Sequence, residues 1–127
     1  MTRLTRSFPL TDDVQIPAVG FGTYLIEDDI AADAVAAALS VGYRHIDTAS
    51  GYGNEAGVGR GVRASGLARD EVFVTTKLWP GNPAWGQAVQ GYEGTLVAAA
   101  ESLDRLGLEQ VDLYLIHAPY GGAERLN

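Results

Sequence analysis

The sequence has no cysteine, no long apolar run and few basic residues, and each absence excludes a class of protein. Without cysteine, neither a disulfide framework nor a thiolate metal site can form. No apolar run approaches the ~20 residues of a membrane-spanning helix. Met1 to Leu10 carries arginines but no apolar core of signal-peptide length. We therefore expect a soluble, intracellular protein of the cytoplasm.

Basic residues are outnumbered, with 9 lysines and arginines against 16 acidic residues and a net charge of -7. This charge opposes binding to nucleic acids and to anionic membranes. An anionic phosphate cofactor would need a local cluster of donors, because the field of the whole chain works against it. The apolar fraction of 46% is typical of a globular protein, and 127 residues suffice for one domain.

Four strand-like apolar runs alternate with segments of helical periodicity. The predicted strands cover residues 18–24, 45–49, 72–77 and 111–117. A hairpin over residues 8–17 precedes them and is expected to cap one end of the fold. The predicted helices run from a cap at Asp28 or Asp29 to Gly42, from a cap at Asn54 to Ser65-Gly66, and up to Leu106 with a stop at Gly107.

Two of these helices have a clear apolar stripe, and the one between them is rich in glycine. The stripes expected to be buried are Ile30, Ala34, Val35, Ala38 and Leu39 in the first helix, and Leu96, Ala100, Leu103 and Leu106 in the last. Gly57, Gly59 and Gly61 lie in the middle helix, where each glycine costs about 1 kcal/mol relative to alanine. We expect this helix to depend on packing against its neighbours.

Strands that alternate with helices in this way are parallel, which leaves a doubly wound sheet or a barrel. Gly20 and Gly22 lack the third glycine of a dinucleotide fingerprint, because Leu25 stands in its place. In a doubly wound order with the first strand between the second and fourth, His117 would also lie far from Lys77. The barrel is therefore favoured.

A complete (β/α)8 TIM barrel takes ~250 residues, so four units form about half of one. The half has two unpaired edges, which are an aggregation liability. We therefore expect residues 1–127 to be a single domain, the amino-terminal half of such a barrel. The partner would be the missing second half of a longer protein, a second copy of the chain or another polypeptide.

The ends of three successive strands carry residues suited to acid–base chemistry. Asp47, Lys77 and His117 close strands, and Tyr52 stands on a Gly-Tyr-Gly turn. An ammonium beside a phenol makes it a better proton donor, so Lys77 would tune Tyr52. A buried ammonium needs a counter-charge, for which Asp47 is placed, and His117 could orient a substrate oxygen.

Each of these four residues alone also has an ordinary structural explanation, as a solvated strand end, a packing residue or a turn cap. Their occurrence together at three successive strand ends favours a site. The loop over residues 78–86 contains Trp79 and Trp85, which either form a substrate wall or pack against the barrel rim.

Several motifs follow one another along the chain. They are Val19-Gly20-Phe21-Gly22-Thr23, Gly42-Tyr43-Arg44-His45-Ile46-Asp47-Thr48-Ala49, Tyr52-Gly53-Asn54-Glu55, Thr76-Lys77-Leu78-Trp79, Ser102-Leu103-Asp104-Arg105-Leu106-Gly107 and Val111-Asp112-Leu113-Tyr114-Leu115-Ile116-His117. In this order and at these intervals, they make residues 8–119 resemble the amino-terminal half of an aldo-keto reductase.

The resemblance implies NADPH-dependent reduction of an aldehyde or ketone, with Tyr52 as the acid that accompanies hydride transfer. By this similarity the catalytic residues are Asp47, Tyr52, Lys77 and His117, the cofactor-binding residues are Gly22, Thr23, Tyr24 and Asp47, and the substrate-binding residues are Tyr24, Trp79 and His117. No metal is implied.

Two departures from the family limit what the resemblance implies. Ala118 stands where many members carry tryptophan, which implies a wider pocket. The second half, which supplies most NADPH contacts in the family, is missing, so we expect the isolated chain to bind NADPH poorly. An alternative is a noncatalytic half-barrel that self-associates. A hydrolytic barrel is disfavoured, because Asp47 has no partner acid at another strand end and Glu55 lies beyond the turn.

Overall fold

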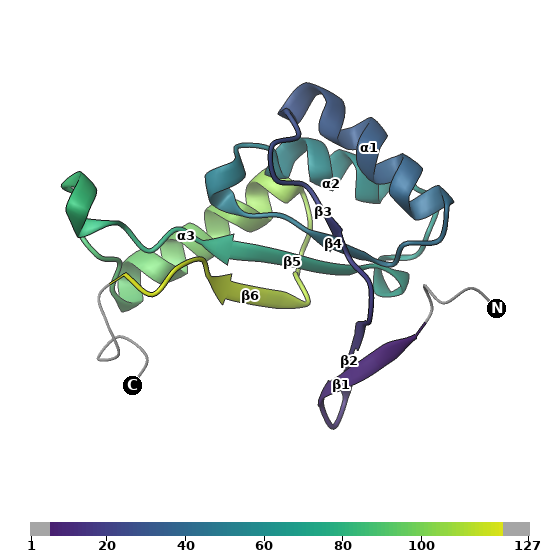
Figure 1. Ribbon diagram of the computed structural model, residues 1–127, viewed down its shortest axis with the longest axis horizontal. Helices are drawn as coiled ribbons and strands as arrows, with labels where there is room; N and C mark the ends of the chain where they lie inside the picture. Colours follow the sequence, from purple (N-terminus) through teal and green to yellow (C-terminus); the bar gives the residue numbers. More distant parts are fainter. Residues whose placement is uncertain (1–5, 121–127) are drawn as a thin grey trace.

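The structure is a computed structural model that describes residues 6–120; residues 1–5, which include half of the Met1–Leu10 segment, and residues 121–127 lie outside the described part. A four-stranded sheet, three helices and a separate hairpin make up the fold (Figure 1). The strands are β1 (Ser7–Thr11), β2 (Val14–Pro17), β3 (Phe21–Gly22), β4 (His45–Asp47), β5 (Phe73–Leu78) and β6 (Leu113–Ile116). The helices are α1 (Asp28–Ser40), α2 (Glu55–Ala64) and α3 (Tyr92–Leu106), with single 3-10 turns at η2 (Ser50–Tyr52), η3 (Arg69–Glu71) and η4 (Pro83–Trp85).

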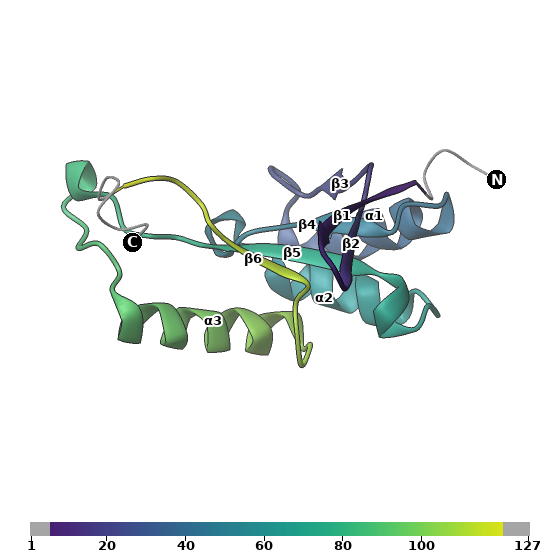
Figure 2. The same ribbon diagram turned by 90° about the horizontal axis from the view of Figure 1, so that it is seen from below.

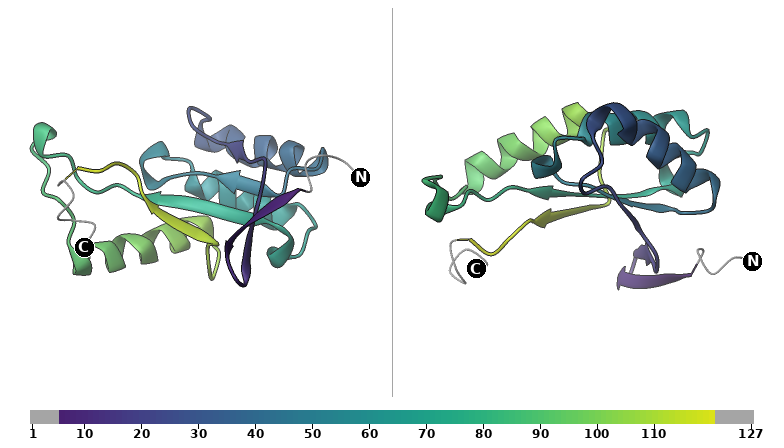
Figure 3. Two further views of the ribbon diagram at one scale, coloured as in Figure 1. Left: turned by 60° about the horizontal axis from the view of Figure 1, so that its bottom comes forward. Right: turned by 45° about the horizontal axis from the view of Figure 1, so that its top comes forward.

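The sheet is parallel throughout, and its order β3-β4-β5-β6 follows the order of the chain. The three helices lie on one face of this sheet, and no helix of residues 6–120 lies on the other face (Figure 3). A doubly wound sheet has helices on both faces, so the described residues have the arrangement of a barrel segment. Within residues 6–120, no helix is long and apolar enough to cross a membrane.

All four predicted strands exist in the sheet, but their limits differ from those expected. The run over residues 18–24 contributes only two residues to β3, which within residues 6–120 pairs with β4 alone. The run over residues 111–117 starts pairing only at Leu113, and the Asp112 carboxylate accepts a hydrogen bond from the backbone of Val74 just before β6. Strand ends are the least predictable part of a sequence pattern.

Glycines let α2 pack closely on the other helices. A Cβ at Gly61 would lie 2.7 Å from the Cβ of Val35 in α1, and one at Gly59 would overlap the Leu106 carbonyl at the end of α3. Distances this short exclude a side chain at either position. The glycines that weaken α2 as an isolated helix are therefore those that allow it to dock, and Val58 and Val62 on the same helix are buried.

The predicted cap and apolar stripe of α1 were wrong in part. The N-cap is Glu27, and the carboxylate of Asp28 accepts a hydrogen bond of 2.7 Å from the backbone of Gly57. Ile30 is exposed, whereas Ala31, which was not expected in the stripe, is fully buried. The close approach of α2 selects the smaller side chain for the contact.

The predicted stripe of α3 holds only at its carboxyl-terminal end. Leu106 is buried, but Leu96 is 51% exposed and Ala100 is also exposed. The beginning of α3 extends past α1 and α2, so the helix layer does not cover it (Figure 2). Gly107 ends the helix in the left-handed conformation, as predicted.

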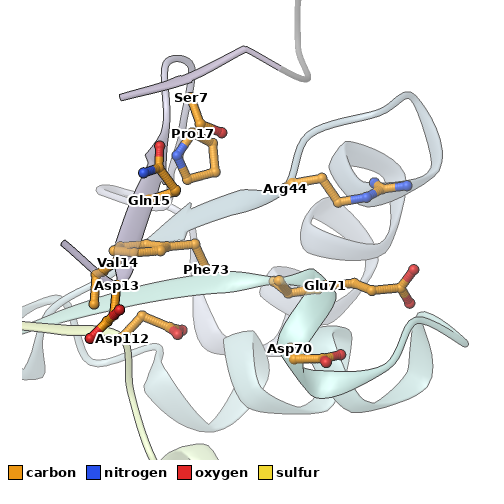
Figure 4. Close-up of a pocket in the computed structure, with 11 residues that line it drawn as sticks. Ser7, Asp13, Val14, Gln15, Pro17, Arg44, Asp70, Glu71, Phe73 and Asp112 are labelled. Atoms are coloured by element: carbon orange, nitrogen blue, oxygen red, sulfur yellow. The ribbon is translucent and has the colours of Figure 1, made fainter. Parts of the chain in front are cut away.

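The expected hairpin forms from β1 and β2, whose antiparallel register pairs Phe8 with Ile16. Between it and the amino-terminal ends of the sheet strands lies an open hollow of about 410 Å³. Phe73 and Asp112 line the hollow from the sheet, and Gln15 lines it from the hairpin (Figure 4). Because the predicted site lies at the carboxyl-terminal ends of the strands, this hollow is remote from it.

Candidate active site

The carboxyl-terminal edge of the sheet brings the four predicted acid–base residues together. Asp47 ends β4, Tyr52 ends the 3-10 turn η2, Lys77 lies one residue before the end of β5, and His117 follows β6. Parallel strands all finish at this edge, which is why residues 70 positions apart in the chain share one pocket mouth. The convergence predicted from the sequence is present in the structure.

Lys77 is the centre of this group. Its ammonium donates hydrogen bonds to the Asp47 carboxylate, to the Thr48 carbonyl at 2.9 Å and to the Tyr52 hydroxyl at 3.4 Å. These three acceptors match the three donors of an ammonium group. The side chain of Lys77 is 14% exposed and that of Asp47 is 32% exposed. The buried ammonium therefore has its counter-charge and also approaches the phenol.

The backbone of η2 places Tyr52 above the end of β5. Gly53 has a φ of 68°, a left-handed conformation that glycine adopts without strain, and it reverses the chain after the tyrosine. The hydroxyl of Ser50 donates to the carbonyl of Lys77 at 3.0 Å and ties the turn to the strand. The Lys77 ammonium lies 5.0 Å from the centre of the Tyr52 ring.

His117 faces the same space with a neutral ring. Its imidazole lies edge-on to the ring of Tyr52, with centres 5.5 Å apart, and to that of Trp79, with centres 5.7 Å apart. Burial, and then the positive charge of Lys77, lower the pKa of His117 below its usual value of 6.5. Its Nδ1 atom is buried, has no hydrogen-bond partner in the described residues and lies on the side of Gly51.

Aromatic side chains form one wall of the mouth. Trp79 stacks on Trp85, with ring centres 5.6 Å apart and an interplanar angle of 16°, and its indole N–H donates to the Gln87 side chain at 2.9 Å. Trp85 is 66% exposed, as expected, whereas Trp79 is half-buried. The segment that carries Trp85 projects beyond the sheet at this end (Figure 2). The contact of Trp79 with His117 favours a substrate wall over packing at the rim.

Residues 22–24 lie beside the acid–base group and differ in accessibility. Gly22 pairs with Asp47 in the sheet, and a Cβ at Gly22 would touch nothing within 4 Å. Tyr24 is 65% exposed, and its ring centre lies 5.1 Å from that of Tyr52. Thr23 is fully buried, and its hydroxyl and amide both donate to the Asp47 carbonyl. Gly22 and Tyr24 therefore face open space, and Thr23 fixes the loop.

Sequence reasoning missed the roles of the two residues that follow the Tyr52 turn. Asn54 occupies the N-cap position of α2 as predicted, but its side chain makes no capping hydrogen bond. It donates instead to the carbonyls of Thr23 and Ile26 at 2.8 and 2.9 Å. The carboxylate of Glu55, the first residue of α2, is buried. A capping pattern gives no signal for such long-range contacts, because Asn and Glu suit a helix start in any case.

Glu55 also bears on the hydrolytic alternative, which requires a second acid beside Asp47. Its carboxylate is bound by Thr76 and Arg105, on the face of the sheet that the helices cover. Glu55 is therefore not available at the mouth. In the part of the chain that the structure describes, no three His, Asp or Glu residues are arranged to hold a metal ion.

Known proteins match this chain closely but extend well beyond it. The family model of the aldo/keto reductases matches residues 18–124. An aldo-keto reductase of Mycolicibacterium smegmatis is 50% identical over 116 residues, which are 91% of this chain and 38% of that protein. The chain thus spans less than half the length of this relative.

Solved structures of the same family share the fold. The crystal structure of an aldo/keto reductase from Brucella melitensis has a TM-score of 0.87 and 46% identity, and the match covers 99% of this chain and 45% of that one. An aldo-keto reductase of Bombyx mori, solved in complex with NADP, has a TM-score of 0.79 and 37% identity over 95% of this chain and 41% of its own. The fold is therefore that of the amino-terminal part of a (β/α)8 TIM barrel, as predicted.

Proposed function

Because the chain belongs to the aldo/keto reductase family, we propose that the protein of which it is the amino-terminal part reduces aldehydes or ketones to alcohols with NADPH. One observation carries this proposal: the Lys77 ammonium lies between the Asp47 carboxylate and the Tyr52 hydroxyl. That arrangement supplies an acid at a pocket mouth. Carbonyl reduction needs such an acid, whereas a purely structural role has no use for one.

The proposed chemistry assigns a separate task to each residue. A bound nicotinamide cofactor supplies a hydride to the carbonyl carbon. The hydroxyl of Tyr52 donates the proton to the carbonyl oxygen, and Lys77 stabilises the phenolate that remains. Asp47 pairs with the Lys77 ammonium and holds it in place. His117, neutral because its pKa is lowered, donates a hydrogen bond to the same oxygen and orients it.

The residues at the mouth fit a nicotinamide and a carbonyl substrate. We assign Gly22, Thr23, Tyr24 and Asp47 to the cofactor, because Gly22 and Tyr24 face open space next to Asp47 while Thr23 fixes their loop. The relative from Bombyx mori was solved with NADP, which supports the choice of cofactor. Tyr24, Trp79 and His117 would contact the substrate.

The decisive experiment is Tyr52→Phe in the full-length protein. Turnover of a small aldehyde should fall at least ~10²-fold, in keeping with the loss of a general acid, while the Kd for NADPH stays within about twofold. Tyr92→Phe is the matched control, since Tyr92 is 76% exposed at the start of α3 and should leave turnover unchanged. Unchanged turnover in Tyr52→Phe would reject the assigned role.

A second candidate, a noncatalytic half-barrel that self-associates or completes a barrel with another chain, is favoured by one feature. β3 and β6 each have only one neighbouring strand within residues 6–120, and Leu115 and Ile116 on β6 are exposed. Light scattering and nicotinamide fluorescence titration of the 127-residue chain separate the candidates. A stable dimer that binds no NADPH indicates the structural role, and tight binding by a dimer indicates a rebuilt site. A folded, monodisperse monomer would contradict the edge argument.

A further inference from the structure

A buried carboxylate lies directly behind the proposed catalytic group. The side chain of Glu55 is 1% exposed and is held on both oxygens. One oxygen accepts a hydrogen bond of 2.7 Å from the Thr76 hydroxyl. The other accepts a hydrogen bond of 2.9 Å from Nε of Arg105 and lies 2.8 Å from Nη2 of the same guanidinium in an ion pair. Such a buried charge needs this full set of partners to be tolerated.

Glu55 and its two partners, Thr76 and Arg105, belong to three different elements of the fold. Glu55 begins α2, three residues after Tyr52, whereas Thr76 immediately precedes Lys77 in β5. Because neighbouring residues of a strand point to opposite faces, Thr76 faces the helices while Lys77 faces the mouth. One carboxylate therefore connects the segment that carries the phenol to the strand that carries the ammonium, and Arg105 anchors both to α3.

The contact between the Lys77 ammonium and the Tyr52 hydroxyl, which depends on the position of α2 against β5, is easily broken. The Lys77 ammonium and the Tyr52 hydroxyl are 3.4 Å apart, at the long end of the range for a hydrogen bond. On the mouth side, the turn is otherwise tied to β5 by the Ser50 hydrogen bond to the Lys77 carbonyl. A shift of α2 away from β5 by a fraction of an ångström would separate the phenol from the ammonium.

We propose that Glu55 is a positioning residue for the reaction: from behind the sheet, it holds Tyr52 within reach of Lys77 through its hydrogen bond to Thr76. The proposal rests on the proposed carbonyl reduction. A role limited to helix stability would need only the start of α2 and Arg105. The Thr76 bond is the part that points to positioning, because it fixes α2 against β5 at the residue next to the ammonium.

The test uses Thr76→Val and Glu55→Gln in the full-length protein. Thr76→Val keeps the shape of the side chain and the pair of Glu55 with Arg105, and it removes one hydroxyl. Both variants should lower kcat by about ten- to a hundredfold, the usual effect of a displaced catalytic group, with KM for NADPH within about twofold.

Asp112→Asn is the matched control at the other end of the sheet. The Asp112 carboxylate also binds an arginine, Arg69, at 2.8 Å, and accepts a backbone bond from Val74 at 2.8 Å. This variant should lose stability while its kcat stays as in the parent. Thr76→Val and Glu55→Gln that keep full kcat would overturn the proposal.

A crystal structure of Thr76→Val gives a readout that does not depend on turnover. The separation of the Lys77 ammonium and the Tyr52 hydroxyl should exceed that in the parent, and an unchanged separation would also overturn the proposal. Absence of carbonyl reduction by the parent protein would instead refute the proposed function, and the separation would still decide whether Glu55 positions the pair.

Discussion

Gly59→Ala reverses the usual effect of replacing a helix glycine. In an exposed helix this change stabilises the protein by up to about 1 kcal/mol. In α2 the new Cβ would lie 2.8 Å from the Leu106 Cα and would overlap the Leu106 carbonyl. These are backbone atoms, so α2 itself must move, and overpacking of this kind costs about 3 kcal/mol. We expect a net loss of about 2 kcal/mol.

Gly94→Ala is the control, because Gly94 lies near the start of α3 and its Cβ would meet only the flexible side chain of Gln90. This change should be neutral or raise the free energy of unfolding by up to about 1 kcal/mol. The assay is urea unfolding of the full-length protein, followed by far-ultraviolet circular dichroism. If Gly59→Ala were as stable as the parent, the close docking of α2 on the end of α3 would be refuted.

Three further predictions concern the site. Lys77→Met should lower kcat at least ~10²-fold with an unchanged Kd for NADPH, because Tyr52 loses its ammonium; equal kcat would contradict this. Burial lowers the pKa of His45 and of His117 below 6.5, so the unfolded chain binds more protons in acid than the folded one does. The free energy of unfolding should therefore fall as the pH drops below about 6.5, and it should fall less in His45→Gln. Urea unfolding from pH 5 to 8 measures both. Trp85→Ala should raise KM for bulky aromatic aldehydes and leave kcat for small aldehydes unchanged, since Trp85 reaches the site only through Trp79; a steady-state substrate series checks it.

The sequence predicted the order of elements because its periodicities are strong and its stops are well marked. Gly107 ends α3 in the left-handed conformation, as the pattern required. The site could be predicted for a related reason: parallel strands align their ends, so Asp47, Lys77 and His117 had to meet once the strands were adjacent.

Details that depend on packing between elements could not be predicted. The burial of Ala31 in place of Ile30 follows from the distance between α1 and α2, which no local pattern encodes. Asn54 matches a cap in sequence, yet its side chain binds two distant carbonyls. Leu96 matches a buried stripe, yet it is exposed because the start of α3 lies beyond the helix layer.

The residues on the helix-facing side of the sheet change from apolar to polar towards the carboxyl-terminal ends of β4 and β5. In β4 and the residue after it, apolar Ile46 is followed on this face by Thr48, and in β5 apolar Val74 is followed by Thr76. All are almost fully buried, but the two threonine hydroxyls donate to the side chains of Asn54 and Glu55, which follow the Tyr52 turn.

Apolar contacts tolerate small displacements, whereas hydrogen bonds weaken steeply with distance and angle. On the helix-facing side of β4 and β5, the positions next to the acid–base group are therefore held by directional bonds, and the positions before them by apolar packing. Changes at the apolar positions, such as Val74→Ala, should lower stability with little effect on the residues at the mouth. Changes at the threonines should alter the distance between phenol and ammonium before they unfold the chain.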